Sequence, residues 1–148
     1  MKKLLLVCLL IPIFCLGQIG KAEEKVDELV LIGVTNKMVG YPKLEKYKGQ
    51  DRYMITYKNL KYTQIVDIKV FSFDATEKDL DYLYNALLEP LVKKDKSPKT
   101  IKVGDVTLNY KKQSSSISVN VDHPIGETNG WMGYLSKKQL ANLFGKGK

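Results

Sequence analysis

The chain has 148 residues, and its 24 basic and 16 acidic side chains give a formal net charge of +8. Two cysteines and one histidine are too few thiolate and imidazole ligands for a zinc finger or a similar Cys/His metal cluster. The charge is usual for a soluble domain, although it also suits contact with nucleic acid, an acidic glycan or a membrane surface. We expect no cofactor.

The first residues have the pattern of a secretory signal peptide. Two lysines follow Met1, residues 4–16 are almost entirely apolar, and Gly17 is a small residue at the end of that run. A charged start, an apolar stretch of about 7–15 residues and a small residue before the cut define such a peptide. The run is also shorter than the about 20 residues of a membrane span. We therefore predict cleavage after Gly17, with residues 1–17 removed and the remainder exported to the periplasm or the cell exterior.

Export in this form would leave a domain without cysteine. Both Cys8 and Cys15 belong to the predicted signal peptide, so the exported chain would have no disulfide and no thiol nucleophile. Lipid attachment at Cys15 is a weaker alternative, because Phe14 stands before it where a small residue is needed. Residues 18–25 are polar and predict a loose lead-in, and residues 26–148 have the length of a single domain.

Alternating apolar residues predict strands in the first half of this domain. Residues 26–35 are rich in Val, Leu and Ile and predict a first strand. Glycine and proline among lysines predict a loop over 36–50. Residues 52–58 and 62–73 each alternate, and the turn-forming segment 58–61 between them predicts a hairpin.

One long amphipathic helix is expected next. Thr76 precedes acidic residues, as an N-cap does, and Pro90 predicts that the helix ends or kinks near Glu89. The lysine-rich segment 93–102 then predicts a solvated linker. The apolar positions repeat with the 3.6-residue period of a helix, and they are Leu80, Leu83, Tyr84, Leu87, Leu88 and Leu91.

The last third predicts more strands and a short helix. Residues 106–111 and 117–121 alternate between polar and apolar side chains. An Asn-Gly turn precedes a short apolar strand at 131–135. Ser136 and Gln139 have the spacing of a capping box, in which each side chain bonds the backbone of the other residue.

These elements predict an α+β domain. We expect a mostly antiparallel sheet of about six or seven strands, with the long helix and a short C-terminal helix on one face. Gly145 is expected just past the end of the last helix.

Tyrosines interleaved with lysines around the hairpin form the candidate binding surface. Tyrosine can stack on bases or sugars while lysine attracts an anion. Alternatively, such rings lie on the core face of the sheet, where aromatic side chains pack well. The candidate binding residues are Tyr47, Arg52, Tyr53, Tyr57, Lys58, Lys61 and Tyr62.

His123 and Trp131 are the single histidine and the single tryptophan. Asp122 lies beside His123, but neighbouring strand residues point to opposite faces, so Asp122 would not orient the ring. No G-x-S-x-G nucleophile elbow occurs. A hydrogen-bonded histidine at a strand end is therefore expected, with no catalytic residue. The acidic residues of segment 74–81 lack the calcium-loop pattern, so we expect no metal site.

Together these features predict an exported, non-catalytic binding module that meets a protein partner through the tyrosine- and lysine-rich hairpin. One alternative is a binder of an anionic polymer, nucleic acid or acidic glycan, through the same surface. A second alternative is a hydrolase that uses His123.

Overall fold

The computed structural model describes residues 27–36 and 41–147. The predicted signal peptide and the lead-in at 18–25 lie outside the described residues. The described residues form strands β1 (Leu29–Val34), β2 (Lys43–Tyr47), β3 (Arg52–Lys58), β4 (Ile68–Asp74), β5 (Lys99–Val103), β6 (Val106–Gln113), β7 (Ser116–Asp122) and β8 (Gly130–Ser136), and helices α1 (Glu77–Val92) and α2 (Lys137–Leu143).

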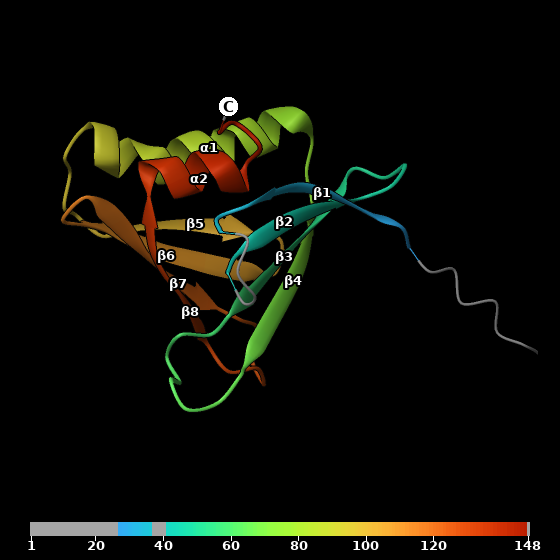
Figure 1. Cartoon of the computed structure of the whole chain (residues 1–148), viewed down its shortest axis with the longest axis horizontal. Coiled ribbons are helices and arrows are strands. Elements are labelled where there is room, and N and C mark those ends of the chain that lie inside the picture. The colour runs from blue at the N-terminus through green and yellow to red at the C-terminus, as the bar shows by residue number, and fades with distance from the viewer. Residues whose placement is uncertain (1–26, 37–40, 148) are drawn as a thin grey trace, which may run out of the picture.

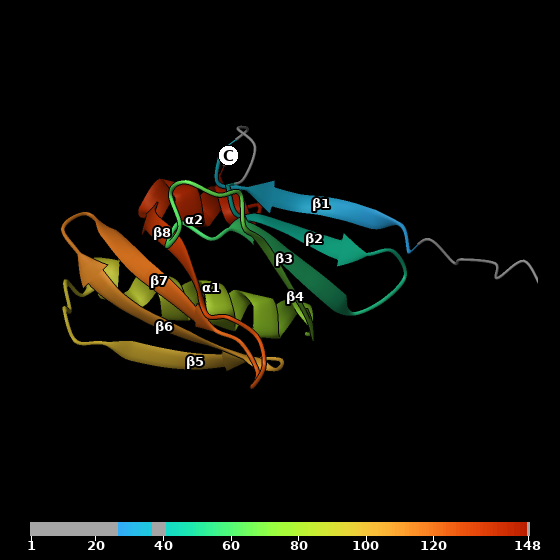
Figure 2. The ribbon, with the colours of Figure 1, turned by 90° about the horizontal axis from the view of Figure 1, so that it is seen from below.

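The strands are divided between two antiparallel sheets of four strands. Sheet A has the order β1-β2-β3-β4, and sheet B has the order β5-β6-β7-β8 (Figure 1). The α+β class is confirmed, but the prediction of one sheet with six or seven strands is wrong. Each strand pairs with its neighbour in sequence, and α1 separates the fourth strand from the fifth. Figure 2 shows the two sheets as separate layers beside the helices.

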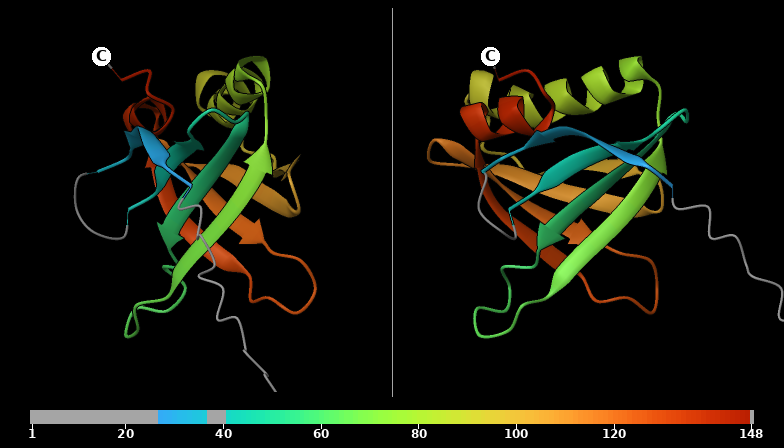
Figure 3. Two further views of the ribbon diagram at one scale, coloured as in Figure 1. Left: turned by 90° about the vertical axis from the view of Figure 1, so that its right-hand side faces the viewer. Right: turned by 45° about the vertical axis from the view of Figure 1, so that its right-hand side comes forward.

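The two helices pack against each other across the inner sides of the sheets (Figure 3). Thr76 caps α1 as predicted and forms a capping box with Asp79, and these hydrogen bonds hold the pKa of Asp79 below its usual range. Pro90 does not end the helix, which continues to Val92. A proline in the last turn removes only one helical hydrogen bond. The Pro90 side chain is itself buried against the core.

The core lies where the inner faces of both sheets meet the helices. Alternate residues of β3 and β4 point into it, and their rings pack closely: the centroids of Tyr53 and Phe73 are 5.9 Å apart, and those of Phe71 and Phe73 are 6.1 Å apart. Sheet B contributes aliphatic side chains, and the helices contribute leucines. The centres of both inner faces are therefore apolar and belong to one core.

Helix α2 also holds the first strand in place. Its capping box of Ser136 and Gln139 is confirmed, and Gly145 beyond its end has φ +69°, the left-handed conformation that glycine adopts without strain. A Cβ at Gly33 of β1 would collide with the backbone oxygen of Asn142. Only glycine allows β1 to approach the helix so closely.

Three segments differ from the prediction. Strand β2 lies within the predicted loop and β5 within the predicted linker. Lys46 of β2 and Lys99 of β5 occupy inward-facing positions of their strands, so neither strand shows a clear polar and apolar alternation. The hairpin of β3 and β4 is confirmed, but residues 62–67 form part of its loop rather than of the second strand. The main-chain and side-chain nitrogens of Asn59 both donate to Asp67, so the loop closes there and pairing begins at Ile68.

Candidate functional site

The seven predicted binding residues do not share one surface. Tyr53 and Tyr57 point inward from β3 and have 2% and 0% of their surface exposed. They therefore belong to the core and not to a surface that a ligand can reach. The alternation of β3 explains this placement, since its odd-numbered residues face the helices and its even-numbered residues face solvent.

The other five residues form two separate groups. Tyr47, Arg52 and Lys58 lie on the outer face of sheet A, where the guanidinium carbon of Arg52 is 5.5 Å from the centroid of the Tyr47 ring. Lys61 and Tyr62 lie in the β3–β4 loop, with the lysine ammonium 5.9 Å from the ring centroid. Arg52 and Lys61 thus each have an aromatic neighbour, but no continuous platform of tyrosines exists among the seven residues.

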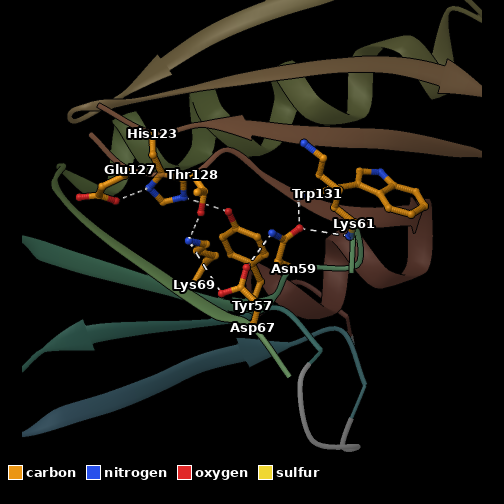
Figure 4. Close-up of polar contacts among 9 residues, drawn as sticks. All are labelled: Tyr57, Asn59, Lys61, Asp67, Lys69, His123, Glu127, Thr128 and Trp131. Carbon is orange, nitrogen blue, oxygen red and sulfur yellow. Dashed lines mark hydrogen bonds and ion pairs between the residues drawn. The ribbon is translucent and has the colours of Figure 1, made fainter. Parts of the chain in front are cut away.

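Buried polar contacts hold the hairpin to sheet B (Figure 4). The Tyr57 hydroxyl is 3.0 Å from Nε2 of His123, and Nδ1 of His123 is 3.1 Å from a carboxylate oxygen of Glu127. The His123 side chain is only 2% exposed. Burial raises the pKa of the Tyr57 phenol above its usual value, and the nearby carboxylates of Asp67 and Glu127 raise it further. His123 is hydrogen-bonded at the strand end, as the sequence indicated.

Asn59 is the centre of a second set of contacts. It is buried, and its side-chain oxygen accepts hydrogen bonds from the backbone N–H groups of Lys61 and Trp131 at 3.1 and 3.0 Å. Its side-chain nitrogen donates to Asp67 at 2.8 Å. The N–H of Leu60 also donates to the backbone oxygen of Trp131 at 2.9 Å. The end of β3 is therefore joined to the start of β8, which fixes the two sheets to each other.

The loops beside these contacts carry exposed apolar side chains. The β3–β4 loop and the β7–β8 loop both project from the end of the molecule opposite the helices (Figure 1). Val66 is 77% exposed in the first loop, and Ile68 and Val70, which follow at alternate positions of β4, are 45% and 47% exposed. We call these three residues the apolar row. It points to solvent while Phe71 and Phe73 of the same strand fill the core.

An edge strand with an apolar outer face is unusual. Among the described residues β4 pairs with β3 alone, so one side of its backbone has no strand beside it. Natural edge strands commonly carry charges, prolines or bulges that prevent further pairing, and an alternating strand normally turns its polar side outward. The residues that face the apolar row across the hairpin, Thr56 and Lys58, leave it uncovered.

The described residues hold no group of three or more His, Cys, Asp or Glu side chains that could bind a metal ion. In the same part of the chain no helix has the length and apolar character needed to cross a membrane.

No protein-family model, curated protein or solved structure matches this chain.

The sequence places Val66, Ile68 and Val70 on one face of the predicted strand, but the exposure of that face and the role of Asn59 were not predicted. The apolar row had a visible signal, because Ile68 and Val70 alternate with Phe71 and Phe73 in a strand that is apolar on both faces. Such strands are normally covered on both sides. Asn59 had no comparable signal, since an asparagine after a strand has the same appearance in sequence whether it only turns the chain or bonds to a distant segment.

Proposed function

We propose that this protein is an exported binding module without catalytic activity, and that a protein partner covers the outer face of its β3–β4 hairpin. The observation that carries the proposal is the exposed apolar row, formed by Ile68 and Val70 on an edge strand and Val66 in the loop before it. Exposed apolar patches mark surfaces that associate with other molecules. A free strand edge can also accept a further strand through main-chain hydrogen bonds.

Charged side chains surround the apolar row and would set the orientation of the partner. Lys58 lies directly opposite Ile68 on β3, and Arg52 is 4.0 Å from Asp74 at the other end of the hairpin. An apolar centre with a charged rim is the usual composition of a protein interface. Charges at such a rim affect the rate and selectivity of association more than its strength.

The alternative of an anionic-polymer binder has less support. Its binding mode needs exposed rings beside cations, and two of the rings assigned to it, Tyr53 and Tyr57, are buried. The hydrolase alternative needs a substrate to reach His123, whose side chain is 2% exposed between Tyr57 and Glu127.

Site-specific photo-crosslinking tests the proposal. A photoreactive residue at Val70, in protein incubated with the envelope fraction of the source cells, should yield one discrete crosslinked protein. The same residue at Lys111, exposed on the outer face of sheet B, is the matched control and should yield none. The double variant Ile68→Thr/Val70→Thr, added in excess as competitor, should fail to suppress the crosslink, whereas excess unlabelled protein should suppress it. Equal crosslinking from both positions would contradict the proposal.

A further inference from the structure

The outer face of sheet B differs from that of sheet A because it is polar on β5, β6 and β7 and carries two aromatic side chains on β8. Its residues on β5, β6 and β7 carry hydroxyl, amide and charged groups, several of them linked across strands. Thr100 donates to the side-chain oxygen of Asn109 at 2.9 Å, and the Asn109 amide donates to Asp122 at 2.6 Å. Ser118 lies on this outer face but is buried beneath the Trp131 ring, whereas Asn120 and Tyr134 are exposed on it.

Trp131 is held in a fixed orientation on this face. Its indole Nε1–H donates to the Ser118 hydroxyl at 3.0 Å, and the Tyr134 ring packs edge to face at a centroid distance of 5.2 Å and an angle of 88°. Its backbone N–H is bonded to Asn59. An aromatic side chain held at both its backbone and its ring is a rigid platform rather than a mobile surface group.

A hollow of about 380 Å³ lies beside this indole, and we call it the Trp131 hollow. Figure 4 shows the Trp131 ring on the side of the polar contacts away from His123, next to Lys61. The volume lies within the about 300–1,000 Å³ typical of small-molecule sites. The hollow is lined by Lys61, Asn120, Asp122, Asn129, Gly130 and Trp131.

Polar groups in the Trp131 hollow remain available to a ligand. The Asn120 side chain makes no hydrogen bond to any described residue, and it lies directly across the strand pair from Trp131. Asp122 accepts a hydrogen bond on one carboxylate oxygen only. Asn129 uses its side-chain oxygen to accept from the N–H of His123, which leaves its NH₂ group as a donor. The hollow thus offers both donors and acceptors beside a flat apolar ring.

We propose that the Trp131 hollow binds a neutral oligosaccharide. The C–H face of a pyranose ring packs on an aromatic ring, and the hydroxyl groups around its edge pair with amides, which both donate and accept, and with carboxylates, which accept. The charges of Lys61 and Asp122 cancel within the hollow, so a phosphate backbone or a sulfated glycan gains little there. Most of the site lies on sheet B and none of its lining residues belongs to the apolar row, so the inference does not rest on the proposed protein-binding function.

The single tryptophan makes the test direct, because all tryptophan emission of the chain comes from this site. The probes are maltohexaose, cellohexaose and chitohexaose at millimolar concentration, titrated into the full exported chain. At least one is expected to shift the Trp131 emission in a saturable way and to raise the thermal unfolding temperature. Heparin and a fifteen-residue oligothymidylate at ~50 and ~200 mM salt test for charge-driven binding instead.

Two matched variants test whether the sugar binds at the Trp131 hollow or elsewhere on the surface. Asn120→Ala removes an exposed side chain without a partner, and it should raise the dissociation constant of the sugar about tenfold, the effect of one or two lost hydrogen bonds. Asn85→Ala, on the exposed side of α1, should leave the constant unchanged. No saturable change with any of the three sugars overturns the proposal. Salt-sensitive binding of heparin or the oligonucleotide alone also overturns it.

Discussion

The two sheets have similar inner faces and different outer faces. Inside, both supply apolar side chains to one core. Outside, sheet A exposes aliphatic residues along β4, whereas sheet B exposes amides, hydroxyls and lysines with an aromatic pair on β8. Folding requires only the inner faces to be apolar, so it does not account for the outer apolar row. The two proposals, a protein partner for sheet A and a sugar for sheet B, rest on this difference.

The contrast between the inner and outer faces of sheet A requires that Tyr57 is a core residue. Tyr57→Ala should lower the free energy of unfolding by about 4 kcal/mol, because it leaves a large cavity between the hairpin and sheet B. Tyr62→Ala, a change of the same side chain in the exposed loop, should cost less than about 0.5 kcal/mol. Urea unfolding followed by circular dichroism measures both values. Similar losses of unfolding free energy for the two variants would contradict the placement of Tyr57 in the core and Tyr62 on the surface.

Asn59 tests whether the two sheets are joined by specific polar contacts. Asn59→Ala should cost about 3 kcal/mol, because buried N–H groups of Lys61 and Trp131 and the carboxylate of Asp67 lose their partner. Asn109→Ala, on the outer face of sheet B, should cost less than about 1 kcal/mol, since water replaces its hydrogen bonds. Urea midpoints of the two variants measured together give the comparison. A small loss for Asn59→Ala would show that packing alone holds the sheets.

The raised pKa of Tyr57 predicts that the folded protein loses stability at alkaline pH. Because the folded pKa exceeds the unfolded value of about 10, this group contributes stability below pH 10 that is lost as the pH rises above it. Tyr57→Phe should cost about 1 kcal/mol at neutral pH, through the lost contact with His123, and should reduce the decline above pH 10. Chemical unfolding at pH 8 and above pH 10 measures the effect, and Tyr62→Phe serves as the control. An unchanged alkaline decline in Tyr57→Phe would contradict the assignment.

The outer apolar row should be the least important region for stability. Ile68→Thr/Val70→Thr keeps β-branched residues at both positions and should change the free energy of unfolding by less than about 0.5 kcal/mol. Val119→Thr makes the same kind of change on the inner face of β7 and should cost about 2 kcal/mol, because its hydroxyl is buried. Differential scanning calorimetry distinguishes the two. A large loss from the outer pair would mean that the row supports the fold itself.

The sequence predicted the elements whose pattern is local. The capping residues Thr76 and Ser136 and the alternating strands β3, β6 and β7 were all recognisable because neighbouring residues carry the signal. Strand β2 was missed since Leu44 is its single fully buried side chain, so no alternation is visible. The division into two sheets depends on long-range pairing, which no local pattern contains.

The candidate sites show the same limit. Composition indicated tyrosines and lysines as binding residues, but the direction in which each side chain points depends on the register of its strand. Tyr57 and Lys58 are neighbours in sequence and face opposite sides of sheet A. The Trp131 hollow combines residues of β7, β8 and the β3–β4 loop, and only the folded chain brings these segments together.

The contact between Gly33 and the end of α2 joins the earliest and the latest described segments of the chain. During synthesis β1 can pair with β2 as soon as both strands have left the ribosome, but its contact with α2 cannot form until the last helix has been made. Contacts between distant segments form late in folding. The packing around β1 is therefore completed only when nearly all of the chain has been made. Gly33 therefore affects when the contact between β1 and α2 forms, as well as how closely the two elements pack.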